Sequence, residues 1–218
     1  MSGDGNRIAI PSNVTNTNEP GSVQVFDIDV ENEKYDPIGV AIISKHNPAA
    51  GNGFGYSVAL SLDGNTLAIT SIKLDDNGNP TVRNTGAIEL FAYDPTSKKF
   101  HAAFPNPTKT SRNNNIIMDD ENEVRRESSA FGIELSLAEN EDVDGVSTST
   151  WLSVRSYNFD TEKGYAKVYN LSEQFYPKCG VEDPSEINNG RCDPFDDFNY
   201  NTKECGWDGG DCPTPAPA

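Results

Sequence analysis

The sequence is short of basic side chains, and this shortage excludes two classes of partner. Its 218 residues contain 17 Lys and Arg against 34 Asp and Glu, which gives a formal net charge of −17 at pH 7. Nucleic acids and anionic membranes attract proteins through a basic surface. We therefore expect no nucleic-acid partner and no binding to anionic membranes.

Long hydrophobic runs are also missing. Hydrophobic residues make up 35% of the chain, and no run of them approaches the roughly 20 residues that a transmembrane helix needs. The chain opens Met1-Ser-Gly-Asp-Gly, without the basic and apolar stretches of a signal peptide. We expect no membrane segment and no signal peptide in this chain.

Catalytic motifs are absent as well. The two histidines, His46 and His101, stand in polar or proline-flanked stretches, outside any Gly-x-Ser-x-Gly elbow or His-Glu-x-x-His helix. Carboxylates are plentiful, but any acidic surface supplies pairs of them, so they do not by themselves indicate acid–base chemistry. The sequence predicts ordinary surface histidines, no catalytic residue and no enzyme.

Cysteine is missing from the first 178 residues, and all four cysteines fall within residues 179–212. This segment carries nine acidic and two basic residues, and it is too short to bury a core without disulfides or a metal. No two of its cysteines stand two to four residues apart, as they usually do in zinc sites. Two disulfides in an oxidising compartment are favoured, with three pairings possible. Residues 213–218 are predicted to form an extended Pro/Ala tail.

Three similar segments organise residues 1–176. In the clearest, apolar residues alternate along Tyr56–Leu62, a turn follows at Asp63-Gly64-Asn65, and Leu67–Ile69 returns, which is a β-hairpin pattern. A further strand is expected at Gly86–Tyr93. Comparable strands follow Asp4-Gly5-Asn6 and the Phe131-Gly132 pair. Units of about 40–50 residues with three or four short strands are typical of β-propeller blades.

The stretch Phe54-Gly-Tyr-Ser-Val-Ala-Leu-Ser-Leu-Asp-Gly-Asn resembles the FG-GAP propeller repeats of extracellular proteins, integrin α-chains among them. The resemblance implies a mostly β fold, a partial propeller-like array with blades at about 2–50, 51–104 and 130–176. The polar stretch 105–129 is expected as a solvated or disordered insertion, and Glu139–Thr150 as a widened hairpin loop. Three blades are too few to close a propeller, so we expect a fragment of a longer secreted protein.

The FG-GAP repeats of integrins hold calcium in Asp-rich hairpin loops. The nearest match here is Asp142-Val-Asp144-Gly145, but no convincing oxygen ligand follows its glycine. A solvated acidic turn is therefore the favoured interpretation of that loop. Asp4-Gly5-Asn6 and Asp63-Gly64-Asn65 are predicted to be turns rather than metal loops.

The ending Cys205-Gly-Trp-Asp-Gly-Gly-Asp-Cys212, preceded by Asn189-Gly-Arg-Cys-Asp193, resembles the Lin-12/Notch repeat, a small calcium-binding extracellular module. That family has six cysteines, paired first to fifth, second to fourth and third to sixth. Both cysteines of the second-to-fourth bridge are missing here. The resemblance implies the disulfides Cys179–Cys205 and Cys192–Cys212, in a module at 177–212 with little regular secondary structure.

The same resemblance implies a Ca²⁺ site. Its ligands would be Asp208 and Asp211, on either side of a glycine pair that can turn sharply, together with Asn189 and Glu186. Glu186 stands where the family has Asp or Asn. A disulfide-held acidic module without calcium is the alternative.

Two Asn-x-Ser/Thr sequons, at Asn13 and Asn170, are candidate glycosylation sites. Together these features predict a secreted or extracellular, non-enzymatic protein, in which a β-repeat interaction scaffold with a protein or glycan partner precedes a calcium-binding Notch-type repeat. One alternative is the accessory region of a secreted hydrolase or protease, and another is a glycan-binding propeller.

Overall fold

The computed structural model describes most of the first 176 residues. The described ranges are 1–12, 20–44, 53–72, 86–105, 116–118, 129–141, 147–158 and 162–176, with Cys179, Cys192, Thr202, Cys205, Cys212 and Pro213. Regular structure in these residues is antiparallel β-sheet, apart from one short helix, α1 (Leu171–Gln174). The prediction of a mostly β protein is confirmed.

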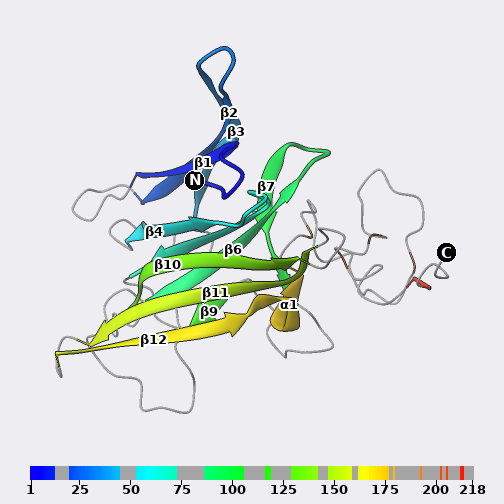
Figure 1. Ribbon diagram of the computed structural model, residues 1–218. Helices are drawn as coiled ribbons and strands as arrows, with labels where there is room; N and C mark the ends of the chain where they lie inside the picture. The colour runs from blue at the N-terminus through cyan, green and yellow to red at the C-terminus, as the bar shows by residue number, and fades with distance from the viewer. Residues whose placement is uncertain are drawn as a thin grey trace.

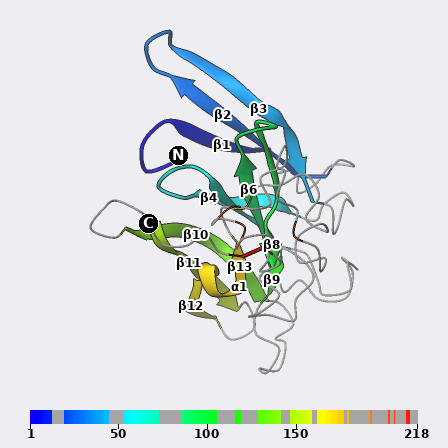
Figure 2. The ribbon, with the colours of Figure 1, turned by 90° about the vertical axis from the view of Figure 1, so that its right-hand side faces the viewer.

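Three sheets follow one another along the chain and in space, and we number them 1 to 3 in chain order. Sheet 2 lies between the other two (Figures 1 and 2). Within the described residues they stack in a row and do not close into a ring. β8 (Phe104–Pro105) and β13 (Phe175–Tyr176) form a separate two-stranded pairing. Sheet 1 comprises β1 (Arg7–Ser12), β2 (Ser22–Asp29) and β3 (Lys34–Ile43); sheet 2 comprises β4 (Phe54–Leu60), β5 (Thr66–Ser71), β6 (Ala87–Asp94), β7 (Lys99–Ala102) and β9 (Ile116–Met118); sheet 3 comprises β10 (Ser129–Glu141), β11 (Ser147–Asn158) and β12 (Lys163–Asn170).

The three sheets repeat one register. In each, a serine near the end of one strand pairs with the residue that directly follows a glycine at the start of the next strand. The glycines are Gly21, Gly86 and Gly164, and the pairs are Ser12–Ser22, Ser71–Ala87 and Ser156–Tyr165. Corresponding positions in the three sheets can therefore be compared residue by residue.

Two of these glycines let neighbouring sheets approach closely. A Cβ atom on Gly21 would overlap the carbonyl oxygen of Phe54, and a Cβ atom on Gly86 would overlap that of Phe131. Gly86 also has a φ of 80°, which L side chains rarely adopt. Phe54 and Phe131 begin corresponding hairpins, so the contact between sheets 1 and 2 recurs between sheets 2 and 3.

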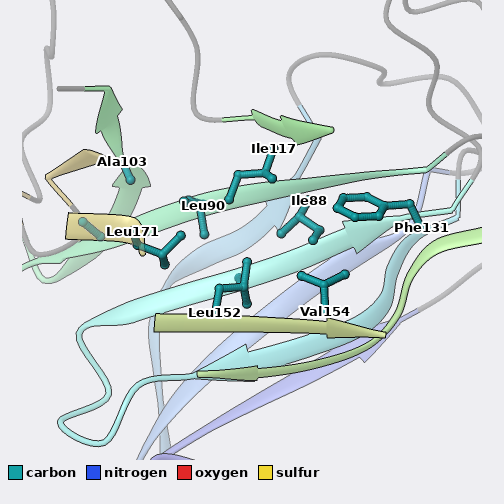
Figure 3. Close-up of a cluster of buried hydrophobic side chains, with 10 residues drawn as sticks. Ile88, Leu90, Ala103, Ile117, Phe131, Leu152, Val154 and Leu171 are labelled. Carbon is teal, nitrogen blue, oxygen red and sulfur yellow. The ribbon is translucent and has the colours of Figure 1, made fainter. Parts of the chain in front are cut away.

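The central strands of sheet 2, β5 and β6, are buried on both faces. Strand β5 is buried at every position, and β6 at all but one, because alternate side chains pack against sheet 1 and sheet 3. Figure 3 shows the core shared with sheet 3, where side chains of β6 and β11 meet around Phe131. The core shared with sheet 1 contains Val23, Val25, Ile38, Phe54, Leu60, Leu67, Ile69 and Phe91.

Two expected loops are more ordered than the sequence suggested. Within the polar stretch 105–129, Ile116–Met118 forms β9 and pairs with β6, because Ile116 and Ile117 bury apolar side chains at the sheet edge. The widened loop expected at Glu139–Thr150 is paired at both of its ends, where Glu139 opposes Thr150 and Asn140 opposes Ser149. Thr148 and Thr150 are β-branched and favour strand.

Candidate functional site

The C-terminal module contains two disulfides. They join Cys179 to Cys205 and Cys192 to Cys212, with Cα–Cα distances of 4.8 and 4.6 Å. This is the pairing, among three possible ones, that the resemblance to the Lin-12/Notch repeat implies. The two bridged loops overlap in sequence, and Cys179, Cys205 and Cys212 are almost fully buried. The two bridges therefore cross-link the chain between Cys179 and Cys212.

The predicted calcium ligands Asp208, Asp211, Asn189 and Glu186 lie outside the described residues, as do His46, Asn13 and the Asp142–Gly145 loop. Among the described residues of the C-terminal segment, the Cys205 N–H donates to the backbone and hydroxyl oxygens of Thr202, both at 3.2 Å. Elsewhere in the described ranges, no group of three or more His, Cys, Asp and Glu side chains is arranged to hold a metal ion.

The two Ser-x-Asp-Gly-Asn turns, at 2–6 and 61–65, have the same hydrogen bonds. In both, the serine Oγ donates to Oδ1 of the aspartate at 2.6 Å. The asparagine N–H and Nδ2 donate to the two oxygens of the same carboxylate at 2.9–3.1 Å. The carboxylate oxygens of Asp4 and Asp63 therefore accept hydrogen bonds within their own turns, as the sequence predicts.

The ionisation of Asp4 reflects these bonds. Burial tends to raise the pKa of Asp4, but hydrogen bonds from Ser2 and Asn6 and the charge of Arg7 outweigh it. Together they hold the pKa below its ordinary value of 3.8. The charged form of Asp4 is thus part of the folded turn.

Hydrogen bonds join these two turns to each other and the second turn to sheet 3. The Asp4 N–H donates to the carbonyl oxygen of Leu62 at 3.0 Å, which joins the first turn to the second. The Asp63 N–H faces Oε2 of Glu139, on β10, at 3.4 Å. One edge of the molecule is therefore a continuous ladder from sheet 1 to sheet 3.

Arg7 connects sheet 1 to sheet 2 at this edge. Its side chain is only 12% exposed and pairs with Asp27 of its own sheet at 2.8 Å. Its Nη1 donates to the carbonyl oxygen of Gly64 at 2.9 Å and to Oδ1 of Asn65 at 3.1 Å. The guanidinium also lies over the Tyr93 ring, 4.0 Å from its centroid. The sequence gives no signal for this role of Arg7, because its partners in sheet 2 are more than 50 residues away.

A groove opens beside the ladder, between strands β4 and β10. Its volume is about 420 Å³, and its lining includes the apolar side chains of Val58, Leu60, Leu135 and Leu137 together with polar groups, Glu139 among them. Among the described residues that line it, none is a histidine, cysteine, lysine or arginine.

His101 lies in the cluster of side chains at the β6–β7 turn. Its Nε2 is 3.0 Å from the Ser97 hydroxyl and 3.9 Å from the Asp94 carboxylate. The Asp94 carboxylate also accepts the N–H groups of Thr96 and Ser97, which closes the β6–β7 turn.

The sequon at Asn170 is built into the fold. Asn170 ends β12, and its Oδ1 is buried without a hydrogen-bond partner. Leu171 is fully buried in the core between sheets 2 and 3, and the Ser172 hydroxyl accepts the N–H of Thr150 at 2.9 Å. These residues join α1 to sheet 3, and glycosylation of Asn170 stays a prediction.

Comparison with known proteins identifies no family for this chain. No family model matches the chain, and no curated protein matches it. In the part of the chain that the structure describes, no helix has the length and apolar character needed to cross a membrane.

Proposed function

We propose that this is a non-enzymatic extracellular protein, in which a propeller-type array of FG-GAP-like sheets serves as an interaction scaffold and a Lin-12/Notch-type module binds calcium. Its disulfides stabilise the module at 177–212, and the sheets present surfaces to a protein or glycan partner. The pairing of the four cysteines is the observation that carries this proposal.

The repeat part of the proposal is supported by geometry that recurs between sheets. The same Phe–Gly contact joins both pairs of neighbours, through Phe54 and Gly21 and through Phe131 and Gly86. The same hydrogen-bonded turn directly precedes β1 and β5. An array in which each unit packs only on its neighbours is the arrangement expected of repeat proteins, and its broad surfaces suit binding to other molecules.

The calcium part is supported by the Cys192–Cys212 bridge. Asn189 stands three residues before Cys192, and Asp211 directly precedes Cys212. The bridge joins Cys192 to Cys212 with a Cα–Cα distance of 4.6 Å, and each of these cysteines stands within three residues of a proposed ligand in the sequence. Ca²⁺ prefers carboxylate and amide oxygens, and a bound ion would offset the repulsion among the module's carboxylates.

Calorimetric titration of the intact chain with Ca²⁺ tests the calcium site. We expect a binding heat and an increase in thermal stability for the wild type, and loss of both in the double variant Asp208→Asn/Asp211→Asn. Glu134→Gln, which changes an exposed carboxylate on sheet 3, is the matched control and should bind as the wild type does. Equal binding by all three proteins, or no calcium heat from any, would contradict the proposal.

Reduction of the disulfides provides a second readout. Because the four cysteines lie outside the three sheets, a reducing agent should abolish the calcium heat and leave the β-sheet circular dichroism unchanged. Calcium binding that survives full reduction would contradict the proposed site.

A further inference from the structure

The outer face of sheet 1 is apolar and uncovered. Val23, Val25 and Ile38 point inward and are buried against sheet 2. Successive side chains of a strand alternate between faces, so the residues between them point outward. Cross-strand pairing assigns the following ten residues to this sheet-1 outer face: Ile8, Ile10, Ser12, Ser22, Gln24, Phe26, Ile28, Tyr35, Pro37 and Ile43.

None of these ten residues is charged. Large apolar side chains among them meet solvent, with Tyr35 63%, Ile10 48% and Ile43 47% exposed. The full chain carries 51 charged residues, 17 basic and 34 acidic, so an uncharged sheet face is unusual in it. Contiguous apolar surface of this kind marks an interaction site in a soluble protein.

The same residue pattern is buried in the other two sheets. The register equates Ile8, Ile10 and Phe26 of sheet 1 with Leu67, Ile69 and Phe91 of sheet 2, which are 0, 0 and 4% exposed. In sheet 3 the corresponding Leu152 and Val154 are fully buried. In both cases the covering surface is the face of a neighbouring β-sheet. The pattern is therefore one that packs against another sheet.

The outer face of sheet 3 is not suited to packing against another sheet. It carries the ion pair of Arg155 and Glu134, joined at 2.7 Å and with both side chains more than half exposed. Ser136 and Ser153 pair beside it, and both are exposed. Burying this face would desolvate two charges. Of the outward faces of the two end sheets, only that of sheet 1 is both apolar and uncharged.

We propose that the sheet-1 outer face binds the same face of a second copy of this chain, related by a two-fold axis. An uncharged apolar surface is complementary to itself, and an isologous contact leaves no face open for further growth. With a net charge of −17 on each copy, mutual repulsion is least where no charges lie on the contact. Both Figures 1 and 2 show sheet 1 at one end of the stack, where a second molecule can approach.

Sedimentation velocity of the intact chain over a range of concentrations tests the dimer. We expect a concentration-dependent species of twice the chain mass, which tightens as added salt screens the repulsion between copies. Ile10→Lys should raise the dimer dissociation constant by about 100-fold or more, because it buries an unpaired charge. Tyr35→Glu, at a more exposed position that leaves folding intact, should do the same.

Val168→Lys is the matched control. Val168 is 66% exposed on the outer face of sheet 3, and the variant should dimerise like the wild type. A wild-type chain that stays monomeric at every concentration overturns the proposal, as does a dimer that survives both sheet-1 substitutions. A dimer that Val168→Lys disrupts equally, or that weakens with added salt, would place the contact elsewhere.

Discussion

Removing the guanidinium of Arg7 should loosen sheet 1 from sheet 2. Arg7→Met keeps the aliphatic stem in place and deletes the hydrogen bonds to Gly64 and Asn65, the ion pair with Asp27 and the contact with the Tyr93 ring. No other described side chain reaches this set of partners in both sheets, so the loss falls on the junction itself.

The magnitude follows from how exposed each contact is. The two hydrogen bonds from a largely buried charged donor contribute the most, about 1 kcal/mol or more each. The ion pair adds little, at most about 1 kcal/mol, because Asp27 is half-exposed and solvent screens it. The cation–π contact adds about 0.5–1 kcal/mol. Since these terms overlap, we expect a total destabilisation of about 3 kcal/mol.

Urea unfolding followed by far-ultraviolet circular dichroism measures this loss, with Arg155→Met as the control. Arg155 makes an ion pair of similar length, 2.7 Å, but both partners are exposed. Arg155→Met should therefore change the free energy of unfolding by less than about 0.5 kcal/mol. If the two variants lose equal stability, Arg7 does not join the sheets and the reasoning is wrong.

Two further predictions concern the repeat contacts and the turns. Gly86→Ala should destabilise the protein by about 2 kcal/mol or more in the same unfolding assay, because its Cβ would meet the Phe131 carbonyl and its φ is 80°. Gly164→Ala is the control and should be nearly neutral, because its Cβ would make only ordinary contacts. A similar loss of stability at both sites would contradict the repeated contact. Because the folded pKa of Asp4 is depressed, its stabilisation is present above pH 3.8 and lost as the pH falls through the folded pKa. Asp4→Asn should remove that part of the acid dependence, and an unchanged pH profile would refute it.

The sequence predicts local structure well wherever a short motif determines it. The Ser-x-Asp-Gly-Asn turns form as expected, directly before β1 and β5, because all of their hydrogen-bonding groups lie within five residues. The strand starting at Phe54 and the strand at Gly86–Tyr93 follow from alternating apolar residues. The cysteine pairing came from a family resemblance, since spacing alone leaves three possibilities.

Contacts between distant segments were harder to predict. Ile116 and Ile117 are two apolar residues in a polar stretch, too few for a periodic pattern, and they become a strand only because β6 offers an edge. The bridging role of Arg7 depends on partners in a different sheet. A single sequence contains no signal for either contact.

The outer face of sheet 1 shows why pattern alone cannot assign an interface. Ile8 and Ile10 alternate with smaller or polar residues as Leu67 and Ile69 do, so the sequence predicts a buried face in both strands. Burial depends on what lies opposite, and sheet 1 provides the cover for Leu67 and Ile69 while Ile10 has none among the described residues. A repeated sequence thus predicts how each sheet packs on its neighbour, and it leaves the surface of the first sheet in the stack for a partner to cover.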